Sequence, residues 1–177
     1  MQNVGKAAGN TRVFCFGIGT DVNAHLLDKI TEETRASSTY VTPQEDIEVK
    51  VSSFYTKIKE PVLANPELEF SGGIRVTKLY PNPLPDLFRG EELVLVGRYK
   101  GKGDGDVILK GTLAGKKTQL EFPVTFPAQA DHDFIPRLWA TRRVGYLLDE
   151  IRLRGENKEL KDEVTTLARK YGIVTPY

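Results

Sequence analysis

The chain has 177 residues, 40% hydrophobic and 28% charged, so it can bury the core of one domain or of two small ones. The formal net charge of +1 gives no global reason to expect nucleic acid or an acidic membrane as a partner. The single cysteine, Cys15, excludes an internal disulfide framework and a cysteine-rich zinc site. No apolar run approaches the length of a membrane span, and the first ten residues lack the apolar core of a signal peptide.

The chain begins with the pattern of a strand followed by a helix. Residues 12–18 form an apolar run bounded by glycines, which predicts a buried strand. Thr20 and Asp21 provide N-cap chemistry for a helix that carries its apolar residues at positions 26–30.

The same pattern repeats directly afterwards. Residues 37–41 predict a second strand, and Thr42, Pro43 and Glu45 form the signature of a capping box at the start of a second helix. That helix places one apolar stripe at helical spacing, consisting of Ile47, Val51, Phe54, Tyr55 and Ile58. Two strands alternating with two helices predict a parallel sheet, and two strands alone cannot cover both faces of such a unit. We therefore interpret residues 1–59 as the end of a larger α/β domain.

The pattern then changes to that of an antiparallel sheet. Residues 59–73 contain prolines and a double glycine, which indicates a linker or a domain entry. We predict strands at residues 74–80, 92–99, 106–113 and 118–126, with a solvated hairpin tip at 100–106 and a turn at Ala114-Gly115. In the last strand, Leu120, Phe122, Val124 and Phe126 alternate with polar residues, so this strand should be half-buried, and Pro123 indicates an edge or a bulge.

The last third of the chain predicts a helical hairpin. Two apolar stripes at helical spacing are separated by a short polar turn at residues 154–157. Asn157 is a candidate N-cap, and Gly172 ends the second helix. The expected fold class is thus α+β, with an antiparallel β domain at about residues 60–130 and a helical hairpin at about 134–172. We expect Trp139, Leu147, Leu148 and the Leu87-Phe88 pair to serve in packing.

One turn raises the question of a phosphate or nucleotide site. Gly17 and Gly19 follow a strand and precede a helix, as in a dinucleotide fingerprint, but Val22 stands where the third glycine is needed. A phosphate-binding module that uses the Gly17–Asp21 turn with the lysines at 100–103 is the alternative hypothesis. The interpretation that we favour is a strand-to-helix turn that binds nothing.

Other groups of reactive side chains predict structure rather than chemistry. Asp104 and Asp106 lack the further ligands of a calcium loop. His132 stands between Asp131 and Asp133, and residues adjacent in sequence seldom converge on one metal. Cys15 lies within the predicted buried strand, where a thiol is usually inert, so a pairing with His25 is not favoured. The arginines at 137–154 predict a solvated helix face, with stems packed on aromatic rings, rather than a nucleic-acid groove. No catalytic, cofactor-binding or metal-binding residue is assigned.

Several segments taken in order resemble the inter-alpha-trypsin inhibitor heavy-chain family, whose members combine a VIT domain with a von Willebrand factor A domain. Residues 12–30 and 39–58 resemble the late strands and helices of the A domain. Residues 79–99, with Leu-Phe-Arg-Gly, resemble the region that follows it. Residues 134–177, with Pro-Arg-Leu-Trp-Ala and the final Gly-Ile-Val-Thr-Pro-Tyr, resemble the family's helical segment.

The resemblance implies a non-enzymatic interaction or adhesion module, located outside the cell or in the cell envelope, with a protein or matrix ligand. The divalent cation of such A domains is held by an Asp-x-Ser-x-Ser loop, which this sequence does not contain. The resemblance therefore implies a piece without that metal site. The family's Asp-Pro-His-Phe attachment motif is also absent. We further expect an unpaired sheet edge near residues 13–18, through which two copies would pair as a homodimer.

Overall fold

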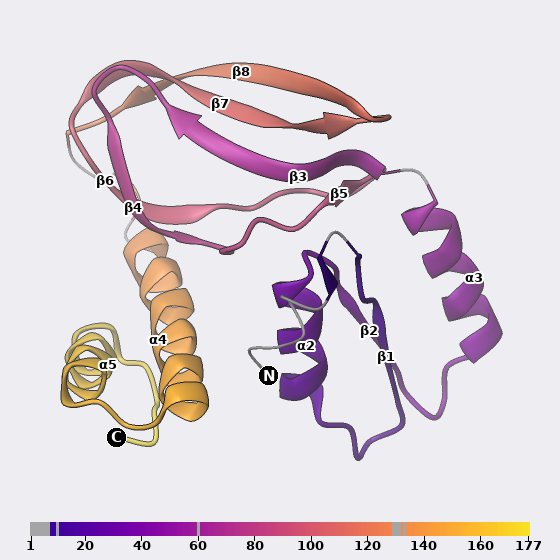
Figure 1. Cartoon of the computed structure of the whole chain (residues 1–177). Coiled ribbons are helices and arrows are strands. Elements are labelled where there is room, and N and C mark those ends of the chain that lie inside the picture. Colours follow the sequence, from indigo (N-terminus) through magenta and orange to yellow (C-terminus); the bar gives the residue numbers. More distant parts are fainter. Residues whose placement is uncertain (1–7, 10, 60, 129–131, 133) are drawn as a thin grey trace. The chain divides into compact units, whose positions relative to one another are not determined.

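The computed structural model describes residues 8–9, 11–59, 61–128, 132 and 134–177. It divides the chain into two compact units, which we treat separately (Figure 1). Unit 1 comprises residues 1–71, 81–94 and 106–123, and unit 2 comprises residues 72–80, 95–105 and 124–177. In the described part of the chain the fold class is mixed, with four helices, one parallel strand pair and antiparallel strands, as the sequence predicts.

Unit 1 begins with the predicted strand–helix–strand–helix segment. Strand β1 (Cys15–Ile18) pairs in parallel with β2 (Ser38–Val41), in a register that runs from Cys15 opposite Ser38 to Ile18 opposite Val41. Helix α2 (Ala24–Glu33) connects the two strands, and α3 (Ile47–Ile58) follows β2. The two helices flank the strand pair (Figure 1). The parallel pair and both helices confirm the prediction.

The helix starts differ from the predicted ones. Helix α2 is capped by Asn23, whose side chain accepts a hydrogen bond from the backbone N–H of Leu26, and not by Thr20 or Asp21. Helix α3 is capped by Asp46, which accepts from two backbone N–H groups and so satisfies more of the free donors than Thr42 would. Glu45 does accept hydrogen bonds from Thr42, but within the preceding turn.

The segment expected to be a linker is a strand of the second sheet in unit 1. Strand β3 (Pro61–Phe70) lies between β5 (Leu87–Phe88) and β7 (Gly103–Leu113), and β8 (Lys116–Phe126) forms one edge of this four-stranded sheet. Its prolines occupy positions that a strand tolerates: Pro61 is the first residue, and Pro66 lies at an irregularity in the pairing with β7. The edge position of β8 confirms the prediction made from Pro123.

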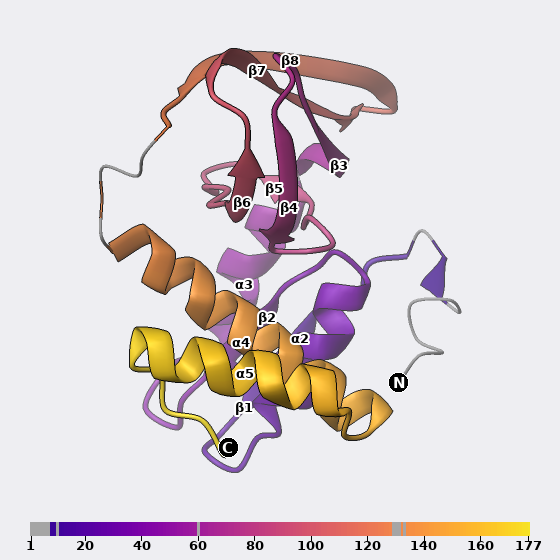
Figure 2. The same ribbon diagram turned by 90° about the vertical axis from the view of Figure 1, so that its left-hand side faces the viewer.

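Unit 2 contains a two-stranded ribbon and the helical hairpin. Strands β4 (Arg75–Tyr80) and β6 (Val96–Lys100) pair in antiparallel fashion. Helices α4 (Phe134–Arg154) and α5 (Lys158–Tyr171) lie side by side (Figure 2) and bury a common core at Val144, Leu147, Ile151 and Val164. Asn157 caps α5 and Gly172 ends it in the left-handed conformation, as predicted. Among the described residues, no helix is long and apolar enough to cross a membrane.

Candidate functional site

The Gly17–Asp21 turn is shaped by packing. A Cβ atom on Gly17 would lie 2.6 Å from Cδ1 of Tyr40 and 2.8 Å from Cγ1 of Val22, so only glycine fits between these side chains. Gly19 has a φ of +91°, and its N–H donates to the carbonyl oxygen of Val41 at 3.0 Å. The structure thus explains the need for glycine at both positions without a ligand. The lysines at 100 and 102 belong to the other unit.

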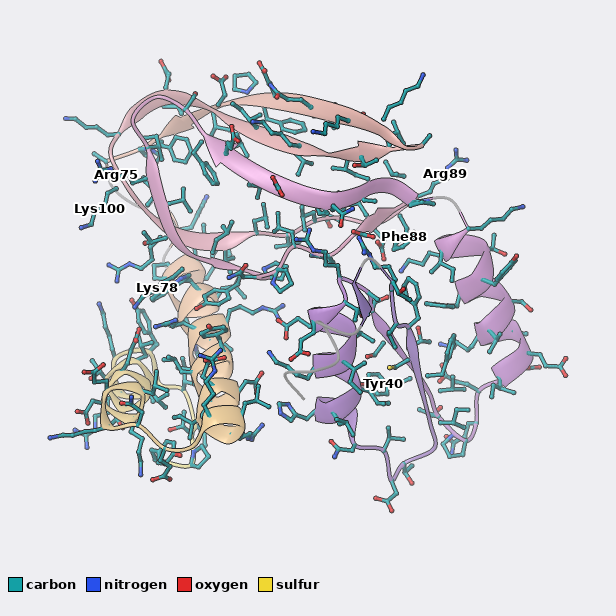
Figure 3. All side chains as sticks on the ribbon, in the orientation of Figure 1. Tyr40, Arg75, Lys78, Phe88, Arg89 and Lys100 are labelled. Carbon is teal, nitrogen blue, oxygen red and sulfur yellow. The ribbon has the colours of Figure 1, made fainter. Side chains whose placement is uncertain are left out.

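Tyr40 ties β2 to α2 rather than facing a ligand (Figure 3). Its hydroxyl lies 2.6 Å from Oδ1 of Asp28 and 3.0 Å from the carbonyl oxygen of Ala24. Desolvation, followed by the hydrogen bond to Asp28, raises the pKa of the Tyr40 hydroxyl above its ordinary value. The ring therefore stays neutral and holds the strand against the helix.

Cys15 and His132 lie in different surroundings. Cys15 is half-buried, and desolvation, with a smaller contribution from the negative charge of Asp28, raises the pKa of its thiol. A protonated thiol is a poor nucleophile. His132 is exposed, with its ring centroid 5.7 Å from that of Phe134, while Asp131 and Asp133 lie outside the described residues. Within the described part of the chain, no three His, Cys, Asp or Glu side chains gather to hold a metal ion.

The acidic residues of the 100–106 segment hydrogen-bond to other protein side chains. Asp104 accepts a hydrogen bond from Oγ1 of Thr125 at 2.6 Å, and Asp106 accepts from Oγ of Ser71 at 2.9 Å. The predicted hairpin tip is shorter than expected, because β7 already begins at Gly103. The aspartates therefore hold neighbouring segments of the chain together.

The basic side chains of α4 include one member of an ionic cluster within unit 2. Arg143 donates to both carboxylate oxygens of Glu163, at 2.9 Å and 2.7 Å, and Nζ of Lys78 lies 2.6 Å from the same carboxylate. These cations, Arg143 first, lower the pKa of Glu163 to about 2. Arg143 also donates to the hydroxyl of Tyr80 at 3.0 Å and lies 5.6 Å from the ring centroid of Tyr146. The predicted packing of arginine on an aromatic ring is confirmed at Tyr146.

Trp139 has the packing role that the sequence predicts. It is 5% exposed, and its Nε1–H donates to the carbonyl oxygen of Lys78 at 3.0 Å. The guanidinium of Arg98 lies 5.2 Å from the centroid of its ring. Leu147 and Phe88 are also buried, as expected.

A second ionic tie, in unit 1, was not identified from the sequence. Asp86 is buried and binds Nε of Arg12 at 2.6 Å and Nη2 at 3.0 Å. Asp86 also accepts a hydrogen bond from the backbone N–H of Asn65 at 2.8 Å. Asn65 has a positive φ of +50°. The only signal in the sequence is an aspartate in the otherwise apolar stretch at residues 84–88, which does not reveal its partners.

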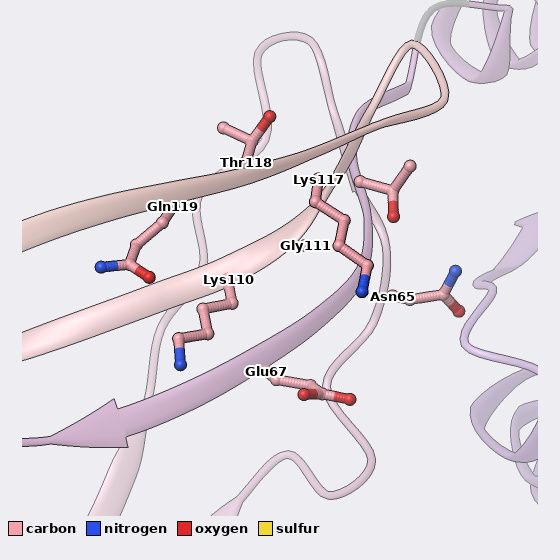
Figure 4. A pocket seen from close by; sticks show the side chains of 8 residues that line it. Asn65, Glu67, Lys110, Gly111, Lys117, Thr118 and Gln119 are labelled. Carbon is pink, nitrogen blue, oxygen red and sulfur yellow. The ribbon is translucent and has the colours of Figure 1, made fainter.

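An open groove lies on one face of the four-stranded sheet (Figure 4). Its volume is about 500 Å³, and its side chains include Asn65, Glu67, Lys110, Lys117 and Gln119. Its lining side chains carry ammonium, carboxylate, amide and hydroxyl groups, unlike the mainly apolar lining of a typical small-molecule site. A polar surface of this kind fits a protein contact better than an enclosed ligand.

Two apolar surfaces of unit 1 remain exposed. None of the residues of α3 is buried; in the predicted stripe, Ile47, Val51 and Tyr55 are exposed, and only Phe54 is held by ring contacts to Phe14 and Phe16. On β8, side chains of the face predicted to be buried remain about half exposed: Leu120 by 47% and Phe122 by 48%. Exposed apolar rows of this kind are typical of surfaces that bind another protein segment.

The sequence of this chain is similar to those of several known proteins. The chain is 26% identical to inter-alpha-trypsin inhibitor heavy chain H2 of Sus scrofa, over 94% of this chain and 19% of that protein. It is 22% identical to a von Willebrand factor A domain-containing protein of Dictyostelium discoideum, over 100% of this chain and 22% of that protein. No family model matches.

One solved structure, of von Willebrand factor type A from Catenulispora acidiphila, has a TM-score of 0.44 and 15% identity, and covers 97% of this chain and 51% of that chain. The chain spans about a fifth of the length of the curated relatives that it matches. The resemblance drawn from the motifs is confirmed. Nearly the whole chain is similar in sequence to one segment of the inter-alpha-trypsin inhibitor heavy chains and of proteins with a von Willebrand factor A domain.

Proposed function

We propose that this chain is a non-catalytic interaction or adhesion-type module of a protein similar to the inter-alpha-trypsin inhibitor heavy chains. One observation carries the proposal: nearly the whole chain matches such proteins in sequence. The exposed apolar rows on α3 and β8 support it. The partner in this proposal is a protein or matrix ligand, and the location is extracellular or in the cell envelope.

The proposal includes a division of the chain. Residues 1–59 are the C-terminal part of a von Willebrand A-like α/β domain, and residues 60–177 are the antiparallel region with its helical hairpin. The parallel β1–β2 pair supports the first part, since parallel sheets are normally covered on both faces by helices and extend over more strands. The unburied apolar residues of α3 also support it, because further chain packed there would remove them from water.

Binding by this module should not depend on a divalent cation. The sequence has no Asp-x-Ser-x-Ser loop, and the described residues offer no cluster of metal ligands. Surface plasmon resonance of the purified chain against a panel of matrix proteins tests this. We expect saturable binding to at least one of them, with the same Kd in 1 mM magnesium and in EDTA. Loss of that binding in EDTA would contradict binding without a divalent cation. The absence of binding to every matrix protein in the panel would contradict the proposed interaction function.

The alternative hypothesis, a phosphate- or nucleotide-binding site at Gly17–Asp21, needs its own experiment. We would titrate ATP, and separately inorganic phosphate, to millimolar concentration while recording amide chemical shifts. The proposal predicts no shift at the amide of Gly19, which already donates to Val41. A saturable shift there would support the alternative instead.

Self-association at a free sheet edge also belongs to the proposal. In the described part of unit 1, β1 has a strand neighbour on one side only, as expected for the homodimer through residues 13–18. Sedimentation velocity over a range of concentrations should show a dimer. A monomer at the highest concentration would contradict it.

A further inference from the structure

Strand β8 presents a second and longer free edge. It has eleven residues and lies at the end of the four-stranded sheet, with β7 as its only strand neighbour among the described residues. Every residue from Lys116 to Thr125 is exposed except Thr118, whereas most of β7 is half-buried or buried. An exposed edge strand of this length offers its free backbone groups to another strand.

The two faces of β8 differ in character. Because side chains alternate along a strand, Lys117, Gln119 and Glu121 share one side of the sheet. Lys117 and Gln119 are among the residues that line the polar groove. Leu120 and Phe122 therefore point to the opposite side. Each face thus has a clear chemical identity in the part of the strand that precedes Pro123.

The turn before β8 and Pro123 indicate which backbone groups point outward. Ala114 and Gly115, both with positive φ, form a two-residue turn that pairs Leu113 with Lys116. Alternate residues after that turn direct their N–H and C=O groups away from β7, and Pro123, which has no N–H, falls on this outward set. Lys117, Gln119 and Glu121 belong to the same set, so their backbone groups are the ones available at the edge.

This edge is complementary to itself. If a second copy pairs in antiparallel fashion about a twofold axis at Gln119, Lys117 lies opposite Glu121 of the second copy, and Glu121 opposite Lys117. On the other face, Leu120 lies opposite Thr118, and Phe122 lies opposite the aliphatic stem of Lys116. About six backbone hydrogen bonds would form between the outward-pointing residues.

The neighbouring registers are less favourable. A twofold axis at Glu121 would place two carboxylates opposite each other and would bring Pro123 into the ladder, where it cannot donate. An axis at Leu120 would also place Pro123 opposite Lys117. Lysine and proline usually protect an edge strand from pairing. Here Lys117 and Pro123 disfavour these two alternative registers and leave the register centred on Gln119 as the favourable one.

The charges that this register requires are available. Lys117 has no ion pair within the described part of the chain, and Glu121 accepts only a hydrogen bond from the Gln119 side chain, at 2.6 Å. Pairing with a second copy would give both side chains an opposite charge at the ends of the dimer contact.

We propose that β8 is a homodimerisation edge, at which two copies pair in antiparallel register about Gln119 with Lys117 opposite Glu121 of the second copy. This inference rests on the proposed interaction function and names a second copy of this chain as the partner. The strand that pairs in this proposal is β8, whereas pairing at residues 13–18 uses β1.

A charge-swap series tests the proposal. The dimer dissociation constant of the full chain is measured by sedimentation equilibrium for the wild type, Lys117→Glu, Glu121→Lys and the double variant. Each single change converts both symmetric ion pairs into like-charge pairs and should weaken the dimer about tenfold. The double variant restores both pairs with reversed polarity and should return to within about threefold of the wild type.

Two further variants distinguish pairing at β8 from a general effect of charge and from pairing at another strand. Lys102→Glu changes the same charge away from β8 and should leave the dimer unchanged. Gln119→Pro removes an outward N–H and should abolish pairing at β8, so that only association through residues 13–18 remains, while the circular dichroism spectrum and melting temperature stay close to those of the wild type. A dimer insensitive to all β8 changes would overturn the β8 register but leave pairing at residues 13–18 standing. A wild type that is monomeric at millimolar concentration would overturn self-association at both edges.

Discussion

Charged side chains in this chain tie together segments that are far apart in sequence. In unit 1, Asp86 binds Arg12 and the backbone of Asn65, and in unit 2, Glu163 binds Arg143 and Lys78. Each carboxylate satisfies several donors at once, which reduces the cost of taking it out of water. These ties add polar contacts between distant segments to those of the hydrophobic clusters.

Removal of the Asp86 carboxylate should destabilise the protein strongly. Asp86→Ala leaves the largely buried guanidinium of Arg12 without its carboxylate and the N–H of Asn65 without its acceptor, so we expect a loss of about 3 kcal/mol in unfolding free energy. The matched control is Lys57→Ala, which breaks the more exposed ion pair with Glu91 and should cost less than about 0.5 kcal/mol. Urea denaturation measures both values. Equal losses would contradict the role of Asp86 as a buried tie.

The Glu163 cluster should make the protein sensitive to acid. The pKa of Glu163 in the folded state is about 2, against an ordinary value of 4.5, so its contribution to stability is complete above about pH 4.5 and is lost as the pH falls toward 2. Because the pair is partly exposed, we expect this contribution to be about 1 kcal/mol. Glu163→Gln should therefore lose less stability than the wild type between pH 5 and pH 2.5.

The control for the acid experiment is Glu92→Gln, which removes an exposed carboxylate from unit 1. Its loss of stability between pH 5 and pH 2.5 should equal that of the wild type. Thermal melts at each pH provide the measurement. If Glu163→Gln and the wild type lose stability in parallel, the carboxylate is not the source of the acid sensitivity.

At the scale of elements, the start of each helix depends on which of several neighbouring polar side chains caps it. Asn23 caps α2 and Asp46 caps α3, because their side chains reach the free N–H groups of the first turn. The turn between β1 and α2 depends on two glycines that are required for different reasons. Gly17 leaves room for Tyr40 and Val22, and Gly19 supplies a positive φ.

Substitution of each glycine by alanine should separate these two causes. Gly17→Ala forces a Cβ to within 2.6 Å of the Tyr40 ring, so we expect a loss of about 2 kcal/mol from overpacking. Gly19→Ala meets no neighbouring atom and should lose about 1 kcal/mol through backbone strain alone. Tyr40→Leu, which shortens the clashing side chain, should reduce the cost of Gly17→Ala but not that of Gly19→Ala. Chemical denaturation of the single and double variants measures the coupling free energy of each glycine substitution with Tyr40→Leu. Equal coupling for Gly17→Ala and Gly19→Ala would contradict two separate causes.

At the scale of the whole molecule, the charges nearly cancel. The chain has 25 Lys and Arg residues against 24 Asp and Glu residues, so copies repel one another weakly at pH 7. The exposed rows on α3 and β8 add apolar surface that favours contact between copies.

Self-association should therefore depend on pH. We expect light scattering at high concentration to be stronger at pH 7 than at pH 5, because the net charge, only +1 at pH 7, becomes more positive as the pH falls and copies then repel one another more strongly. The measurement is best made on Gln119→Pro, so that pairing at β8 does not contribute. Scattering that is equal at both pH values would show that net charge is not the controlling property.

The sequence by itself predicted a large part of the architecture. The parallel β1–β2 pair, the edge position of β8, the caps at Asn157 and Gly172, and the shared core of α4 and α5 follow from periodicity, turn chemistry and one proline. These features depend on residues close together in the chain, where local geometry controls the outcome.

Other features were decided only by the tertiary structure. Residues 61–70 form a strand despite two prolines, because pairing with β7 and β5 outweighs the local turn signals. The stripe on α3 and the row on β8 are correctly patterned but exposed, since a pattern shows which side of an element is apolar and not whether anything covers it. Asp86 finds Arg12 only because the fold brings positions 74 residues apart together. Periodicity is a local property of the chain, whereas burial and ion pairing depend on contacts between distant segments.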